Sequence, residues 1–119
     1  MGILDKVKNK IKGFADSRVQ TIQNKQQQLQ QAQFSYAQIS NLFSEDHFIP
    51  FSAWAISSET IHHVLNDIQI NNRKFIVEFG AGASTFYIAK LIKIHKLKAR
   101  FYSIESNPEW IRTLQAQLT

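Results

Sequence analysis

Two glycines separated by one residue, and preceded by an acid, follow a short apolar run in the second half of this chain. The run at 75–77 leads to Glu78, and Gly80 and Gly82 come just before an amphipathic segment. This order is typical of a buried strand, a tight turn and the first turn of a helix. Glycine lets the backbone turn sharply and approach a ligand, and the unpaired N–H groups that open a helix suit a phosphate or carboxylate. The pattern therefore predicts a turn that binds a nucleoside-containing cofactor.

Three further polar residues complete this pattern. Ser84 and Thr85 come directly after the glycine turn, where their hydroxyls can donate to a ligand or cap the following helix. Glu105 follows a second strand-like run, at 100–104. At the carboxyl end of a neighbouring strand its carboxylate can accept two hydrogen bonds from a ribose diol, and it would repel a 2′-phosphate. We prefer this interpretation to a ligand-free turn with Glu105 on the surface.

These residues resemble the motifs of one enzyme family. The segment 77–82, Val-Glu-Phe-Gly-Ala-Gly, looks like the first motif of the class I, Rossmann-like S-adenosylmethionine-dependent methyltransferases. Ser84 and Thr85 resemble the G-x-G-x-S-T variant found among bacterial members, whereas a dinucleotide fingerprint would have Gly or Ala at Thr85. The segment 102–110 is similar to the motif that follows the second strand in the same enzymes. The resemblance covers roughly residues 50–119.

The resemblance implies a cofactor, S-adenosyl-L-methionine, and a role for each matching residue. Gly80 and Gly82 would shape the loop around the methionine part, and Glu78 would order that loop and the amino end of the ligand. Glu105 would hold the ribose hydroxyls, and the two residues after it would border the adenine. The predicted cofactor-binding residues are Glu78, Gly80, Gly82, Ser84, Thr85, Glu105, Ser106 and Asn107.

The predicted elements around these residues indicate an α/β fold. Residues 74–119 predict strand, glycine turn, helix, strand and helix, the last with Asn107 as N-cap and Pro108 in its first turn. We expect an N-terminal helical arm followed by the first β-α-β-α unit of a doubly wound parallel sheet, an incomplete Rossmann-like fold. The family's sheet has seven strands, so the resemblance implies a C-terminally truncated methyltransferase that is inactive alone. Its catalytic residues are not identified, and its acceptor is expected to be a small molecule or glycan.

Residues 46–73 predict a connector and a docking helix. Pro50 lies in an aromatic-rich stretch that favours an extended connector. Ser57 is a suitable N-cap, and Glu59 would lie in the first turn of the helix, where the helix dipole favours a negative charge. Apolar residues then recur at helical spacing and predict one buried face, made of Ile61, Val64, Leu65 and Ile68.

Residues 1–45 predict a basic, glutamine-rich helical arm, formed by one helix or two. Apolar residues recur every seven positions along it, at Ala15, Ile22, Leu29, Tyr36 and Phe43. Such a stripe must pack on something, and we favour docking within the chain over helix-mediated self-association. Residues 1–14 also resemble a basic interfacial helix, so peripheral membrane contact is a further hypothesis.

Composition narrows the function classes. The chain of 119 residues has no cysteine and a net charge of +5. We expect no metal site, no membrane span and a cytoplasmic location. We do not expect a nucleic-acid partner, because solvated helix faces account for this charge. Two alternatives stay open: a non-catalytic helical interaction protein with a relic nucleotide-binding turn, and a fragment of an NAD-dependent oxidoreductase.

Overall fold

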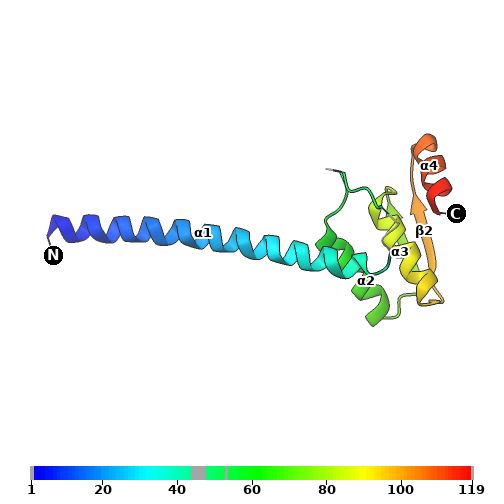
Figure 1. Ribbon diagram of the computed structural model, residues 1–119, viewed down its shortest axis with the longest axis horizontal. Coiled ribbons are helices and arrows are strands. Elements are labelled where there is room, and N and C mark those ends of the chain that lie inside the picture. The colour runs from blue at the N-terminus through cyan, green and yellow to red at the C-terminus, as the bar shows by residue number, and fades with distance from the viewer. Residues whose placement is uncertain (1, 44–47, 53, 119) are drawn as a thin grey trace. The chain divides into compact units, whose positions relative to one another are not determined.

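The structure is a computed structural model that describes residues 2–43, 48–52 and 54–118. It contains four helices and two strands within these ranges (Figure 1). In chain order they are α1 (Ile3–Ser40), α2 (Ser58–Ile70), β1 (Phe75–Phe79), α3 (Ala83–Ile94), β2 (Arg100–Ile104) and α4 (Pro108–Leu118). The chain divides into two units, Met1–Phe34 and Ser35–Thr119. None of the helices described is long and apolar enough to cross a membrane.

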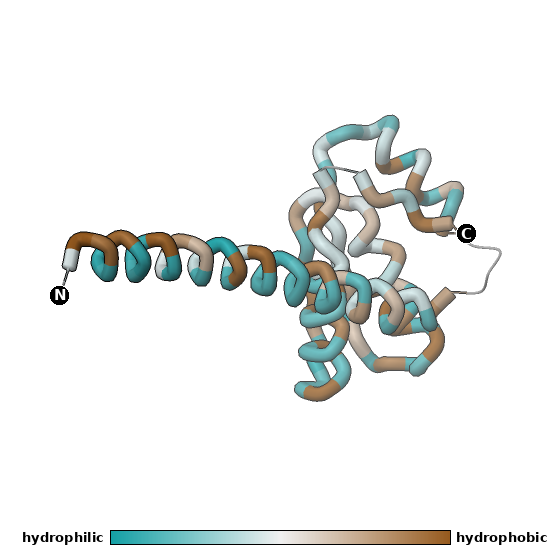
Figure 2. The backbone as a smooth tube through the Cα atoms, turned by 60° about the vertical axis from the view of Figure 1, so that its left-hand side comes forward, coloured by the Kyte–Doolittle hydropathy of each residue, from teal (hydrophilic) through white to brown (hydrophobic). Residues whose placement is uncertain are grey.

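The first unit is most of α1, which is a single uninterrupted helix. The predicted arm of one or two helices is therefore one helix as far as Ser40, and residues 44 and 45 lie outside the described part of the chain. Figure 2 shows apolar positions that recur along this otherwise hydrophilic helix. The stripe residues Ile22 and Leu29 are exposed.

The last turn of α1 belongs to the second unit and is buried through a different face. Ile39 is 2% exposed and Ser35 is buried, whereas Tyr36 of the predicted stripe is 51% exposed. The Ser35 hydroxyl lies 3.2 Å from Nδ1 of His62 on α2. Of the predicted stripe, Phe43 packs against the core, with its ring centroid 5.1 Å from that of Tyr87, whereas the last turn of α1 is buried through Ser35 and Ile39.

The second unit has one apolar core, between α2, α3 and β1. The predicted face of α2 is confirmed, since Ile61, Leu65 and Ile68 are buried and Val64 is packed against them. The core also includes Ile39, Ile76, Ala83, Tyr87, Ile88 and Leu91. The predicted cap is confirmed as well, because the Ser57 side chain accepts a hydrogen bond from the Thr60 N–H.

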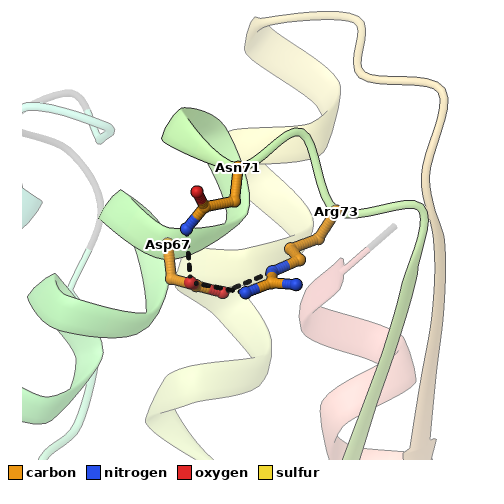
Figure 3. Close-up of polar contacts among 3 residues, drawn as sticks. All are labelled: Asp67, Asn71 and Arg73. Atoms are coloured by element: carbon orange, nitrogen blue, oxygen red, sulfur yellow. Dashed lines mark hydrogen bonds and ion pairs between the residues drawn. The ribbon is translucent and has the colours of Figure 1, made fainter.

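A polar cluster joins the end of α2 to the start of β1 (Figure 3). Asp67 accepts hydrogen bonds from Nδ2 of Asn71 at 2.7 Å and from Nε of Arg73 at 2.9 Å. The Arg73 guanidinium, followed by the Asn71 amide, holds the pKa of the Asp67 carboxyl below its usual value. Asn72 between them has a φ of 50°, in the left-handed region that asparagine tolerates at a helix end. The cluster therefore fixes the turn that sends the chain into β1.

The two strands are parallel, with Phe75 opposite Arg100 and Phe79 opposite Ile104. Ile76 and Phe101 are paired in this register, and both contribute to the core that α3 covers. The alternate residues of both strands form the opposite face, and they are mostly exposed: Phe75, Val77, Phe79, Tyr102 and Ile104.

The predicted fold class is wrong. Within its described residues the chain is mostly helical, and its sheet has two strands, too few for the first unit of a doubly wound α/β sheet. A doubly wound sheet is covered by helices on both faces, whereas one face of this sheet is exposed. The individual strands and helices follow local sequence patterns, and such patterns do not specify how many strands associate.

Truncation of the core isoleucine Ile61 should lower the free energy of unfolding by about 2–5 kcal/mol, since Ile61→Ala leaves a cavity. Ile61 is 1% exposed, whereas Ile70 of the same helix is 78% exposed. The matched control Ile70→Ala should therefore change that free energy by less than about 0.5 kcal/mol. Urea unfolding followed by tryptophan fluorescence measures both, and equal losses would contradict this packing.

Candidate functional site

The glycine turn connects β1 to α3 at the carboxyl ends of the two parallel strands. Gly80 has a φ of +86°, in the left-handed region that favours glycine, and its N–H donates to the Ile104 carbonyl at 2.8 Å. A Cβ added at Gly80 or Gly82 would meet nothing within 4 Å. Backbone conformation, and not lack of space, therefore explains glycine at position 80.

Glu78 gathers the hydroxyl groups that surround this turn. It accepts hydrogen bonds from Ser84 Oγ at 2.7 Å, from Ser103 Oγ at 2.6 Å and from Thr85 Oγ1. Ser103 is opposite Glu78 in the strand register, so both side chains lie on the same face of the sheet. Glu78 thus links β1, β2 and the first turn of α3.

Thr85 acts as part of the cap of α3. Its hydroxyl accepts a hydrogen bond from the Gly82 N–H at 3.0 Å, and its own N–H donates to the Gly82 carbonyl. The side chain is buried, with Thr85 5% exposed. Thr85 was predicted either to donate to a ligand or to cap the helix, and these contacts are those of a cap. Ser84 is more exposed than Thr85.

Glu105 joins the two turns that follow β1 and β2. Its Oε2 accepts from the Ala81 N–H at 3.0 Å, and its Oε1 accepts from the N–H groups of Ser106 at 2.8 Å and Asn107 at 3.0 Å. The N–H groups of Asn107, Ala81 and Ser106 hold the pKa of this carboxyl below its ordinary value, against a smaller opposing effect of burial. A carboxylate has about four acceptor positions, so about one is left for a ligand hydroxyl.

Trp110 makes the second bond between these turns. Its Nε1 donates to the Ala81 carbonyl at 2.7 Å. Trp110 lies in the first turn of α4, where the Asn107 side chain accepts from the N–H groups of Glu109 and Trp110, as the predicted N-cap should. The sequence-based prediction included Trp110 as the last residue of the segment 102–110 and gave its side chain no partner. Because a Trp N–H usually has a hydrogen-bond partner when the ring is buried, the position of Trp110 five residues after Glu105 could have indicated a polar contact near the two turns.

A cavity of about 200 Å³ lies beside the glycine turn. Its lining includes Glu78, Gly80 and Ser84. The other lining residues are apolar: Ile56, Ile61, Val64, Ile76, Val77, Phe79 and Ile88. A carboxylate attracts an ammonium or sulfonium group, and the apolar walls suit an alkyl chain. Because pockets for whole small ligands are about 300–1,000 Å³, this cavity fits only one end of a nucleoside cofactor. Sequence analysis did not predict that α2 would form its wall.

Polar side chains of α2 and from the end of α3 line a separate cavity of about 150 Å³, among them His62, Asn66, Gln69 and His95. No group of three or more His, Asp or Glu side chains that could hold a metal ion occurs within residues 2–43, 48–52 and 54–118. His62 faces Ser35, and His95 ends α3 near Gln69. The candidate site is therefore taken at the ends of β1 and β2, where the polar residues predicted from the sequence come together.

Removing the charge of Glu105 should make the stability of the folded chain less dependent on pH. Its lowered pKa means that the ionised carboxylate stabilises the folded state above the ordinary glutamate pKa of about 4.3, and that this stabilisation is lost as pH falls through the lower folded value. Glu105→Gln should therefore unfold at lower urea than the parent chain at about pH 7, with a smaller difference at about pH 3. Asp16→Asn, exposed and away from both ends of α1, is the charge control and should show the same small difference at both pH values. An unchanged difference at both pH values would contradict the role of the carboxylate.

No protein-family model, curated protein or solved structure matches this chain. The resemblance to methyltransferases is thus carried by the residues of the two turns.

Proposed function

We propose that this chain binds S-adenosyl-L-methionine at the β1–α3 turn and is the cofactor-binding part of a methyltransferase. The main support for the proposal is that two acidic residues, Glu78 and Glu105, lie at the carboxyl ends of the two parallel strands. Glu78 and Glu105 lie on either side of the Gly80–Gly82 turn and bond to it or to the helix that follows. Anchored carboxylates beside an open glycine turn suit a ligand with a cationic end and a diol.

The methionine end of the cofactor would occupy the cavity beside Glu78. Its ammonium group would face the Glu78 carboxylate, and its alkyl chain would contact Ile61 and Val64. Ser84 also lines the cavity and donates to Glu78, so it would hold the carboxylate in place for the ammonium. The cavity volume of about 200 Å³ suits an amino-acid-sized group.

The nucleoside end would lie over the β2–α4 turn. Glu105 has about one acceptor position left for a ribose hydroxyl, and Ser106 and Asn107 are exposed beside it for the adenine. Methyl transfer requires the acceptor to be held in line with the methyl group, and it needs little covalent chemistry from the protein. The acceptor is proposed to be a small molecule or glycan, and the reaction to take place in the cytoplasm.

One observation favours a second candidate, a helical interaction protein with a ligand-free turn. The polar groups of the site bond extensively to one another: Thr85 to Glu78 and Gly82, and Glu105 to three backbone N–H groups. Such a turn is complete without a ligand. A binding measurement therefore separates the two candidates.

Calorimetric titration with S-adenosylhomocysteine should detect binding to the full chain. Glu78→Gln should weaken it roughly tenfold or more, because a charge-assisted hydrogen bond to the ligand is lost. Val64→Phe should abolish binding by filling the cavity while leaving the unfolding midpoint unchanged or higher. Asp16→Asn, at an exposed position within α1, is the matched charge control and should bind normally.

Two outcomes would reject the cofactor. No heat of binding with either S-adenosylhomocysteine or S-adenosylmethionine would favour the ligand-free turn. Binding of NAD, with none of the methyl donor, would favour an oxidoreductase.

A further inference from the structure

The first four turns of α1 have an exposed apolar face. Five side chains form it, and each is exposed by about half or more: Ile3 82%, Leu4 75%, Val7 48%, Ile11 64% and Phe14 65%. At 100° per residue these five positions fall within an arc of about 100°, which is the width of a helix face that packs against an apolar phase.

Basic groups lie on both sides of this face. Lys8 and Lys10 fall roughly 90° and 70° from its centre, on opposite sides, and Lys6 and Lys12 lie further out. The acid of this segment, Asp5, falls about 150° from the centre, on the opposite side of the helix. The Arg18 guanidinium lies 5.1 Å from the centroid of the Phe14 ring. At 100° per residue Arg18 falls about 10° from the centre of the face, so a cation ends the apolar face one turn after Phe14. The apolar face is thus bordered by cations, with the acid turned away.

We propose that residues 3–14 bind an anionic membrane surface as an interfacial helix. Lysines beside an apolar face can extend their alkyl stems along it and place their ammonium groups among acidic headgroups. The five apolar side chains would enter the boundary between headgroups and acyl chains, with the helix axis parallel to the surface. Each lysine near an anionic leaflet adds attraction that salt weakens.

A membrane fits this face better than a second copy of the helix does. A coiled-coil partner would have to continue along the helix past Phe14, where Arg18 and Lys25 border the stripe of Ile22 and Leu29. In a parallel pair these like charges would lie opposite one another, which is unfavourable. Among acidic lipids the same cations are favourable, and the apolar arc of residues 3–14 is complete by itself.

Co-sedimentation of the full chain with vesicles tests this proposal. Binding to phosphatidylcholine vesicles with about 30 mol % phosphatidylserine should be at least tenfold tighter than to phosphatidylcholine alone, and should weaken at about 0.5 M salt. Ile11→Gln with Phe14→Gln removes apolar contact without changing charge and should weaken binding roughly tenfold or more. Ile22→Gln with Leu29→Gln, on the same helix, is the matched control and should bind within about twofold.

Three results would overturn the proposal. They are no binding to acidic vesicles, equal binding to neutral ones, and equal loss in the control. Sedimentation equilibrium on the same variants tests the competing occupant, a second copy of the chain. If the chain forms dimers, the double variant Ile11→Gln with Phe14→Gln dissociates them and vesicles are not bound, then this face belongs to a second copy. Circular dichroism of each variant verifies that α1 remains helical.

Discussion

The Glu105 carboxylate accepts hydrogen bonds from three backbone N–H groups, and these bonds hold the end of this sheet together. Ala81 belongs to the turn after β1, whereas Ser106 and Asn107 belong to the turn after β2. Turns that leave a sheet edge have N–H groups without ladder partners, and a carboxylate can satisfy several of them at once. Trp110 satisfies the Ala81 carbonyl in the same way. The relative position of the two turns, and hence any site between them, depends on these bonds.

The two acids have different partners and therefore different freedom to bind a ligand. Glu105 bonds to backbone groups, which cannot rotate away, so its carboxylate is fixed and nearly saturated. Glu78 bonds to hydroxyls of Ser84, Thr85 and Ser103, and it also lines a cavity. Hydroxyls can turn and exchange partners at small cost. Glu78 is consequently the acid better able to accommodate a cationic ligand group, and Glu105 the one that keeps the turn in shape.

Sequence predicted the features of this chain that depend on near neighbours. Ser57 and Asn107 cap their helices because their side chains reach N–H groups two or three residues ahead. The bond from Trp110 to Ala81 and the apolar wall supplied by α2 join residues far apart in sequence, so no local pattern reveals them. The fold class failed for the same reason. The strand at 100–104 was recognised correctly, but the number of strands beside it is a tertiary property.

Because one face of the sheet is exposed, the hydrogen bonds of Glu105 and Trp110 matter more here than they would in a sheet buried on both faces. Ile76 and Phe101 contribute to the core on one side, while Val77 and Tyr102 on the other side remain about half exposed. Burial therefore fixes the strands from one side, and polar bonds at their carboxyl ends must fix the turns. A ligand that contacted both turns would add links of the same kind, and a ligand that binds only the folded state stabilises it in proportion to its affinity. For such a ligand, binding affinity and the order of the two turns would be coupled.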